Sequence, residues 1–321
     1  MRILVIGKTG FIGGRITAHL REAGHSIVGT HRPDRPDGLD GPDRLDRPRN
    51  AAVASTHNNV GDSLAFDLLD PLRLREILPK AGIQVVIHAA AMADVGQCER
   101  DPAAALQANR TATAAIANVC SEAQTRLISL STDQVFAGGP PAAGGAVPIG
   151  GYREHDATGP VNLYGLTKQQ AEVAILNMNA SGITIVRLAL VVGRSLQGGR
   201  SSSEQLIAQV ARGETPTLYQ NEFRTPICVA DVCRAIEELL PMGDVKLLHL
   251  GGPERMSRVE LGQRILRLAG LNDTCNAVDA SEPSPGEAKR PRDVALNSSL
   301  AREILKHPPR RLEQWANECI P

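Results

Sequence analysis

The chain has 321 residues, and its 35 lysines and arginines are balanced by 35 aspartates and glutamates. A chain of this length favours one large domain or two smaller domains that share a cleft. Zero net charge provides no long-range attraction for nucleic acid or for an anionic membrane, so we expect neither as a partner. Any anionic ligand must therefore be held by local geometry.

The six cysteines form no CxxC pair, and we expect mostly buried thiols without a metal or redox role. Gly7 and Lys8 interrupt the apolar start too early for a signal peptide. No apolar run approaches the roughly 20 residues that span a bilayer. No cluster of histidines and carboxylates indicates a metal site. These features predict a cytoplasmic protein without a bound metal.

Short apolar runs alternate with alanine-rich helical patterns through the first two thirds of the chain. The predicted strands are 2–7, 25–31, 63–67, 84–90, 125–131 and 183–193. Their nearly continuous apolar character is typical of strands that helices cover on both faces. Strands alternating with helices predict an α/β fold with a doubly wound parallel sheet. The ligand site of such a sheet lies at the carboxyl ends of the strands.

The pattern changes after residue 194. Short β pieces such as "KLLHL" (246–250) separate predicted helices at 202–212, 230–240 and 257–269. We therefore predict a nucleotide-binding domain over 1–193 and a smaller C-terminal α/β region over 194–321, with the chain crossing between the two. A long helix at 101–120, which begins with an Asp cap and a Pro, is predicted within the first domain.

One segment interrupts the alternation of strands and helices. Residues 32–59 are rich in Pro, Gly, Asp and Arg and lack apolar periodicity, so they cannot bury enough surface to offset their ordering entropy. We interpret them as a mobile surface insertion, with a charged clamp for a partner protein as the alternative. Residues 137–151 form a second stretch rich in Gly and Pro, which is either a lid over a site or a simple connection.

A glycine pattern follows the first predicted strand. Gly7, Gly10 and Gly13 stand in "GKTGFIGG" at GxxGxxG spacing, directly before an amphipathic helix. In that place glycines allow a tight turn, a close approach to a pyrophosphate and close packing of the helix on the strand. The helix N-terminus then favours the phosphates. We therefore predict dinucleotide contacts from Gly7, Thr9, Gly10, Phe11, Ile12 and Gly13.

The end of the second predicted strand bears on the choice of dinucleotide. His31 and Arg32 stand where an acid commonly binds the ribose hydroxyls of NAD, and a cation there favours the 2′-phosphate of NADP. We therefore expect NADP(H), while Asp34 keeps NAD(H) open. His88 is interpreted as a hydrogen-bonded structural histidine rather than a catalyst. Further cofactor contacts are expected at the ends of the third and fourth strands, from Asp67, Leu68, Ala89, Ala90 and Ala91.

Two further motifs carry chemistry. In "YGLTKQQAE", Tyr164 and Lys168 lie one helical turn apart on one face, and an adjacent ammonium is expected to lower the pKa of a phenol. "STDQVF" follows a buried strand further upstream. There Thr132 is expected to hold a substrate carbonyl while Tyr164 exchanges its proton and Lys168 also grips the nicotinamide ribose. The substrate side of the site is predicted to include Asp133, Gln134, Val135 and Phe136.

Together with "FRTPICVADV" and "KRPRDVALNSS", these motifs resemble the extended short-chain dehydrogenase/reductases, and among them the dTDP-4-dehydrorhamnose reductase family. The likeness runs from Met1 to about Leu305, interrupted at 32–59. It implies a Rossmann fold, a C-terminal sugar-nucleotide-binding region, and a catalytic set of Thr132, Tyr164 and Lys168. Where that family usually has "STDYVFDG", this chain has Gln134 and Ala137, so its sugar can differ from the deoxysugar of the family.

The smaller region offers two candidate substrate residues. Arg224 and Arg292 are expected to bind a substrate diphosphate, because a guanidinium fork fits phosphate oxygens. The alternative for each arginine is an ion pair at the surface or between the domains.

We predict an NADPH-dependent reductase that acts on a keto group of a nucleotide-linked sugar. The resemblance leaves two alternatives, an epimerase or dehydratase that retains NAD, and a non-catalytic subunit similar to the methionine adenosyltransferase beta subunit. Related dehydratases have a glutamate where this chain has Gln134, which disfavours elimination. A homodimer is left open.

Overall fold

A seven-stranded parallel sheet lies at the centre of the part of the chain that the structure describes. The computed structural model describes residues 1–31, 63–68, 70–139, 150–280 and 288–320. Every neighbouring pair of strands is parallel, which confirms the predicted doubly wound fold. Across the sheet the strands are β11 (Leu247–Leu250), β6 (Ile183–Leu188), β5 (Arg126–Thr132), β4 (Val85–His88), β1 (Arg2–Ile6), β2 (Ser26–His31) and β3 (Ser63–Ala65).

The strand order reverses between β1 and β4, since β2 and β3 extend the sheet on one side and β4, β5 and β6 on the other. At such a reversal the connections leave in opposite directions and open a crevice at the carboxyl edge. The residues that follow β1, β4 and β5 therefore share one edge of the sheet. These residues are Gly7, Ala89 and Asp133, each assigned above to cofactor or substrate binding.

The six predicted strands correspond to β1 through β6, with two differences in the C-terminal part. The segment 183–193 is divided, because β6 ends at Leu188 and β7 (Val191–Val192) pairs with β10 (Ile227–Cys228) outside the main sheet. "KLLHL", which we placed among the short pieces of the smaller region, supplies β11 and pairs with β6. Leu248 and Leu250 of this strand are fully buried, so it completes the core of the main sheet.

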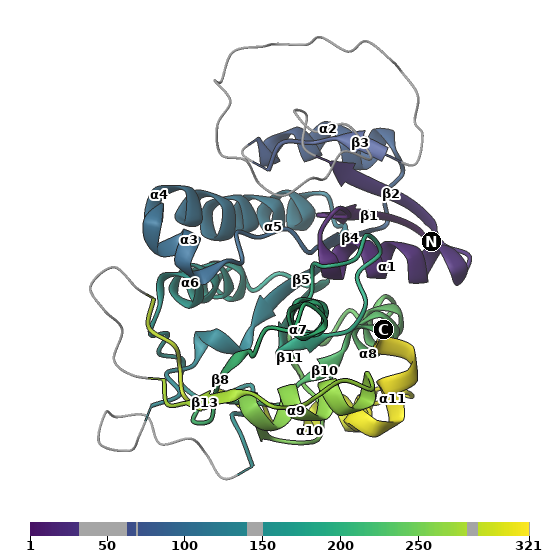
Figure 1. Cartoon of the computed structure of the whole chain (residues 1–321). Helices are drawn as coiled ribbons and strands as arrows, with labels where there is room; N and C mark the ends of the chain where they lie inside the picture. The colour runs from purple at the N-terminus through teal and green to yellow at the C-terminus, as the bar shows by residue number, and fades with distance from the viewer. Residues whose placement is uncertain (32–62, 69, 140–149, 281–287, 321) are drawn as a thin grey trace, which may run out of the picture.

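Helices cover both faces of the sheet (Figure 1). Alternation within β1 separates two cores, because Ile3 and Val5 lie in the first and Leu4 and Ile6 in the second. Every one of these side chains is thus buried, as the nearly continuous apolar pattern predicted. The first core is covered by α1 (Phe11–Glu22) and α8 (Val229–Leu239), and the second by α2 (Leu74–Lys80), α5 (Ala112–Glu122) and α6 (Leu163–Asn177).

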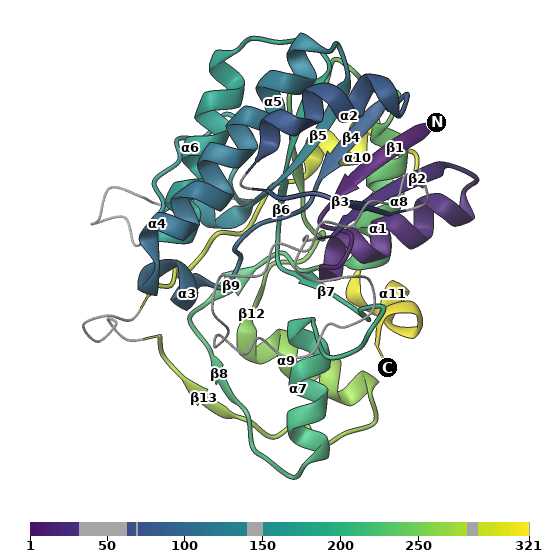
Figure 2. The ribbon, with the colours of Figure 1, turned by 90° about the horizontal axis from the view of Figure 1, so that it is seen from above.

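Short strand pairs of the C-terminal part adjoin the sheet. They are β7 with β10, β9 (Phe223–Arg224) with β12 (Met256–Ser257), and β8 (Thr217–Tyr219) with β13 (Asn276–Val278). Figure 2 shows α7 (Ser202–Ala211) and α9 (Arg258–Leu268) grouped beside β8 and β13. The last helices are α10 (Ser299–Ile304) and α11 (Leu312–Cys319). The boundary between residues 193 and 194 stays a prediction.

The helix predicted at 101–120 consists of three consecutive segments. Asp101 accepts a hydrogen bond from the Ala104 N–H at 3.0 Å and caps α4 (Pro102–Ala105), as its sequence predicted. A π-helical turn, η2 (Leu106–Thr111), then widens the helix before α5 begins. Such turns often lie near functional sites. The other short helices are η1 (Pro71–Arg73), α3 (Val95–Arg100) and η3 (Asp133–Val135).

The cysteines agree with the sequence in part. Cys98, Cys120 and Cys233 are buried thiols, and Cys275 is a half-buried one. Cys228 is disulfide-bonded, which corrects the expectation of thiols at that position. Burial raises the pKa of the Cys120 and Cys233 thiols to about 12, so both stay protonated near neutral pH.

Two sequence predictions cannot be followed in the structure. The insertion predicted at 32–59 and most of the stretch 137–151 lie outside the described residues. In the part that is described, no helix combines the length and the apolar character that crossing a bilayer requires.

The two cores predict that replacing a buried helical leucine lowers the free energy of unfolding more than replacing an exposed one. Leu20 of α1 is fully buried, whereas Leu176 of α6 is 40% exposed. We expect Leu20→Ala to lower the free energy of unfolding by about 2–5 kcal/mol, because it leaves a cavity. Leu176→Ala should change it by less than about 1 kcal/mol. Urea unfolding followed by the fluorescence of Trp315, the single tryptophan, measures both, and equal losses would contradict the assignment of the core.

Candidate active site

The turn after β1 accepts no side chain at two of its glycines. Gly7 has a φ of +94°, and a Cβ there would lie 2.7 Å from the Ala90 nitrogen. A Cβ on Gly13 would lie 2.2 Å from the Gly7 oxygen. Both positions therefore require glycine. Gly10 is exposed and precedes α1 without a side-chain cap, so the first N–H groups of α1 are offered to an anion at this edge.

The other predicted cofactor residues lie around this turn. His31 ends β2, and Arg32 falls outside the described residues. Because β1 to β4 run parallel, their ends meet at one edge, and a glycine cradle beside an uncapped helix start fits a dinucleotide diphosphate. The half-buried members are Thr9, Phe11, Ile12, Leu68, Ala89 and Ala90, and the exposed ones are Asp67 and Ala91.

Thr132, Tyr164 and Lys168 converge at the end of β5. Thr132 is buried, and its hydroxyl interacts with the phenol of Tyr164 in the first turn of α6 and donates to the Asp133 Oδ1 at 3.2 Å. Lys168 lies one turn later, where its Nζ donates to the Leu130 carbonyl at 2.8 Å. The structure thus brings together the three residues that the sequence analysis assigned to catalysis.

Two features fix the start of α6 against the segment after β5. The Asn162 Oδ1 accepts from the Gly165 N–H at 2.8 Å, and its Nδ2 donates to the Gln134 Oε1 at 2.9 Å. A Cβ on Gly165 would lie 2.2 Å from the Gln134 carbonyl oxygen, so only glycine allows this approach. The Gln134 amide, which we expected on the substrate, supports the helix cap through its oxygen.

The electrostatics around Tyr164 differ from the prediction. Burial raises the pKa of the phenol above its ordinary value, the hydrogen bond with Thr132 opposes the increase, and the Asp133 carboxylate adds to it. The predicted lowering of this pKa by Lys168 is therefore wrong, because the cost of burying a phenolate dominates. Burial also lowers the pKa of Lys168 to about 8, against the opposing charge of Glu172.

Two polar residues connect β4 and η2 with the catalytic helix. His88 is buried, and its Nε2 lies 2.9 Å from the Thr113 Oγ1, as expected of a structural histidine. Burial, with the Lys168 charge in addition, lowers the pKa of His88 to about 3, so the ring is neutral near neutral pH. In the π turn, the Asn109 Nδ2 donates to the Thr167 Oγ1 at 3.1 Å and to the Met92 carbonyl at 3.0 Å. The widened turn therefore ties the segment after β4 to α6.

A buried ion pair lies behind Lys168. Glu172, one turn further along α6, accepts from the Arg187 Nη2 at 2.8 Å and also from the Ser131 hydroxyl. Arg187 lies over the Phe136 ring at 5.0 Å. Because both charges are hydrogen-bonded, the pair can be buried without an unpaired ion. It holds α6 against β5 and β6 directly below the catalytic set.

Val135 and Phe136 belong to a core rather than to the site. Both side chains are 0% exposed. The prediction that they contact substrate is therefore wrong for their side chains, because the chain turns inward through η3 after Asp133. Their neighbours in this core are Tyr152, Ala189, Val294 and Leu296.

Asp133 and Arg224 form a buried ion pair between the end of β5 and β9. The Arg224 Nε lies 3.7 Å from the Asp133 Oδ2, and its Nη2 lies 3.9 Å from the Glu222 Oε2. The Nη1 donates to the carbonyls of Phe223 and Pro291 at 2.7 and 3.1 Å. Every nitrogen of this guanidinium thus faces a protein group, which favours the ion-pair alternative over diphosphate binding. Burial raises the pKa of Asp133 to about 6, opposed by Arg224.

Two other arginines adjoin Glu222. The Arg290 Nε lies 3.9 Å from the Glu222 Oε1, and the Arg290 guanidinium lies over the Tyr219 ring at 5.4 Å. Burial lowers the pKa of Arg258, at the start of α9, to about 10, with the Arg224 charge in the same direction. Arg292 is exposed, and its carbonyl accepts from the Phe223 N–H at 2.6 Å. The substrate role of Arg292 stays a prediction.

Several residues that shape the site were not predicted from the sequence. Asn162 carried a readable signal, since Asn directly before a helix is a common cap. Arg187 carried another, because a charge inside an apolar strand must have a partner. Glu222 and Arg258 gave none, as their proximity to Asp133 depends on tertiary packing. Among the described residues, no group of three or more His, Cys, Asp or Glu is arranged to hold a metal.

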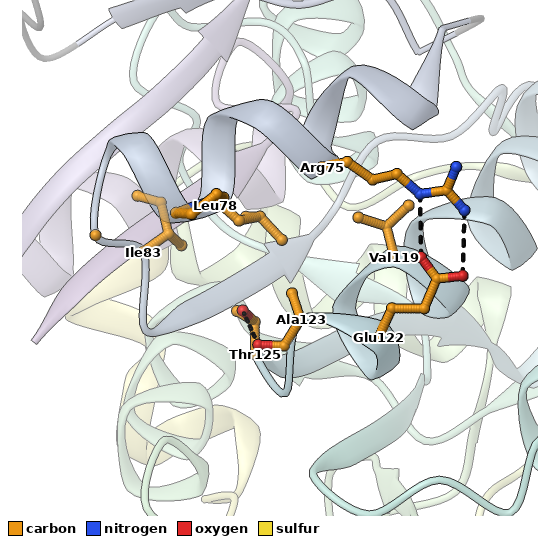
Figure 3. Close-up of a pocket in the computed structure, with 9 residues that line it drawn as sticks. Arg75, Leu78, Ile83, Val119, Glu122, Ala123 and Thr125 are labelled. Atoms are coloured by element: carbon orange, nitrogen blue, oxygen red, sulfur yellow. Dashed lines mark hydrogen bonds and ion pairs between the residues drawn. The ribbon is translucent and has the colours of Figure 1, made fainter.

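A pocket at the opposite edge of the sheet lacks the polar residues found at the carboxyl edge (Figure 3). It lies between α2 and α5, near the residues that precede β4 and β5. Its lining is mainly apolar, from side chains such as Leu78 and Val119. The Arg75 Nε is paired with the Glu122 Oε2 at 3.0 Å. A charged nucleotide therefore fits the carboxyl edge better than this pocket.

Comparisons with known proteins agree with the arrangement. Residues 1–321 match the family model described as the RmlD substrate binding domain. A probable low-salt glycan biosynthesis reductase, Agl14, of Haloferax volcanii is 27% identical over 306 residues, 93% of this chain and 90% of that protein. A dTDP-4-keto-6-deoxy-D-glucose reductase of Streptomyces niveus is 25% identical over 320 residues, 100% and 96% of the two chains. Methionine adenosyltransferase 2 subunit beta of Pongo abelii is 27% identical over 304 residues, 93% and 80% of the two chains.

Solved structures share the fold over nearly the whole chain. A hypothetical dTDP-4-dehydrorhamnose reductase from Sulfolobus tokodaii has a TM-score of 0.76 at 27% identity, covering 98% of this chain and 99% of that one. The dTDP-4-dehydrorhamnose reductase of Bacillus anthracis, solved in complex with NADP, has a TM-score of 0.77 at 18% identity, covering 99% and 96%. At its low identity, the second likeness speaks for the fold alone.

The raised pKa of Asp133 predicts a cost to stability that depends on pH. Between the ordinary pKa of 3.8 and the folded value of about 6, the folded state retains a proton that the unfolded state releases. Stability therefore falls as pH rises through this window, by about 3 kcal/mol at about 1.4 kcal/mol per pKa unit. Asp133→Asn removes the titration, so the variant should gain about 3 kcal/mol relative to the wild type between about pH 4 and about pH 7.

Urea unfolding at both pH values measures this gain. Asp101→Asn is the matched control, because Asp101 is exposed and an asparagine caps α4 equally well. Its stability should follow that of the wild type at both pH values. A stability difference between Asp133→Asn and the wild type that is independent of pH would contradict the prediction.

Proposed function

The chain belongs to the RmlD substrate binding domain family, and we propose that it is an NADPH-dependent reductase of a keto group on a nucleotide-linked sugar. The observation that carries the proposal is the set of Thr132, Tyr164 and Lys168 at the same carboxyl edge of the sheet as the glycine-rich turn. The reductases of Haloferax volcanii and Streptomyces niveus support the reaction class. The Bacillus anthracis protein, which shares the fold, was solved in complex with NADP.

The cofactor, when bound, supplies a hydride to the substrate carbonyl carbon. The turn from Gly7 to Gly13 and the first N–H groups of α1 would hold its diphosphate. Selection of the 2′-phosphate by Arg32 stays a prediction, and NAD(H) stays open as an alternative cofactor.

Tyr164 delivers the proton to the substrate oxygen. Because burial holds the pKa of the phenol above its ordinary value, Tyr164 is protonated at neutral pH and can donate. The alkoxide that forms on reduction is a stronger base than an ordinary phenolate, so it can accept this proton. Thr132, whose hydroxyl interacts with the phenol, orients the same substrate oxygen. With a pKa of about 8, Lys168 is mostly an ammonium at neutral pH and stabilises the phenolate that remains.

A second candidate is a binding subunit without turnover. It is favoured by the 27% identity to methionine adenosyltransferase 2 subunit beta over 93% of this chain. Retention of all three catalytic side chains supports the reductase over this candidate. An NAD-retaining dehydratase is weaker still, because the Gln134 amide has no proton to exchange and its oxygen binds Asn162. The homodimer, the cytoplasmic location and the lack of a nucleic-acid partner stay predictions of the sequence.

Replacement of the phenol tests the proposal. We expect Tyr164→Phe to reduce turnover by at least about 100-fold, since it removes the proton donor, while NADPH binding is preserved. The assay follows loss of reduced nicotinamide with a panel of 4-keto-sugar nucleotides, and fluorescence titration measures NADPH binding. Tyr219→Phe is the matched control, because it keeps the ring beneath Arg290.

Three outcomes separate the candidates. Turnover by the wild type that Tyr164→Phe abolishes supports the reductase. Unchanged turnover in Tyr164→Phe refutes the role of the phenol. Failure of the wild type to oxidise NADPH with every sugar, together with copurification of a methionine adenosyltransferase, would establish the binding subunit instead.

A further inference from the structure

A loop of the C-terminal part contacts the glycine-rich turn. The Arg200 Nη1 donates to the Thr9 carbonyl at 2.7 Å, although the two residues lie 191 positions apart in the chain. Leu196 of the same loop packs on α1, where its Cδ1 lies 3.5 Å from the position that a Cβ on Gly14 would take. Both views show this segment, between β7 and α7, beside the start of α1 (Figures 1 and 2).

The loop is held in this position by one carboxylate. Glu204, in the first turn of α7, accepts from the Ser195 N–H at 2.9 Å, from the Arg200 N–H at 3.1 Å and from the Ser201 N–H at 3.0 Å. Burial alone would raise the pKa of Glu204, but the hydrogen bonds from Ser201 and Ser195 outweigh it and hold the pKa below its ordinary value. The backbone of Arg200 is therefore fixed before any ligand arrives.

The Arg200 guanidinium lies next to the glycine-rich turn, where a bound dinucleotide would place its negatively charged diphosphate. A diphosphate bound at the start of α1 brings negative charge to the turn that contains Thr9. Lys8, the cation within that turn, runs along β2 instead, because its Cδ lies 2.1 Å from where a Cβ on Gly29 would be. Arg200 contacts the turn from the loop between β7 and α7. A guanidinium has five donors in a planar fork that suits phosphate oxygens.

We propose that Arg200 binds the diphosphate of the dinucleotide, so that the C-terminal part of the chain closes on the cofactor as well as on the substrate. The inference rests on the proposed function, which supplies the dinucleotide. It adds a cation from outside the glycine-rich turn to the residues that the sequence predicted. Arg200 is exposed, and the contact of its guanidinium with the Thr9 carbonyl keeps it at the glycine-rich turn.

Direct binding of NADPH and NADH tests the proposal without turnover. We expect Arg200→Gln to weaken both cofactors by about tenfold and to reduce the salt dependence of binding, because a charge-assisted hydrogen bond is lost. Glutamine can still donate to the Thr9 carbonyl, so the loop contact is retained. Arg200→Lys keeps the charge and should recover part of the affinity. Arg212→Ala, at the other end of α7, is the matched control and should bind like the wild type.

The outcomes distinguish this inference from the proposed function. Equal weakening of NADPH and NADH in Arg200→Gln supports the diphosphate assignment. Weakening of NADPH alone would overturn it in favour of the 2′-phosphate, and unchanged binding would overturn it in favour of a loop anchor. Failure of the wild type to bind either nucleotide would overturn both proposals. Turnover by the wild type, together with unaltered nucleotide binding in Arg200→Gln, would overturn only the proposal for Arg200.

Discussion

The close contact between the start of α6 and the segment after β5 determines where the phenol lies. Gly165 approaches the Gln134 carbonyl so closely that a Cβ would lie 2.2 Å from its oxygen. Asn162 closes the same contact from the helix cap. Because Tyr164 stands between these two residues, any side chain at Gly165 would push the phenol away from Thr132. The absence of a side chain at Gly165 thus allows the close contact that places the phenol of Tyr164 near Thr132.

Burial governs the charges at this edge of the sheet. It raises the pKa of Tyr164 and of Asp133, and it lowers that of Lys168 and of His88. Each shift favours the uncharged form of its group, as expected where water is excluded. In such surroundings a charge that develops during a reaction interacts strongly with nearby dipoles. A site of this kind suits a step in which the proton of Tyr164 is given up and the phenolate that remains is stabilised by Lys168.

The fold and the order of the motifs could be predicted because they depend on local patterns. Apolar runs and glycine spacing located the strands and the glycine-rich turn, and the i, i+4 spacing of Tyr164 and Lys168 placed both on one helix face. Side-chain direction after a turn depends on tertiary packing, so Phe136 was placed on the substrate although it lies in a core. For the same reason the proximity of Arg290 to Glu222 could not be read from the sequence. The pKa of Tyr164 was misjudged because a sequence gives spacing between charges but not their exposure to water.

Because β11 from the C-terminal part joins the main sheet, segments cannot be exchanged between related proteins at a single junction. β11 pairs with β6, and α8 packs on α1, where the His19 Nε2 lies 2.7 Å from the Glu237 Oε2. A protein cut after residue 193 would leave β6 with a bare edge and open the first core to water. A chimera designed to alter sugar preference would therefore need two separate grafts, one before α8 and one after β11, with the intervening stretch left in the host.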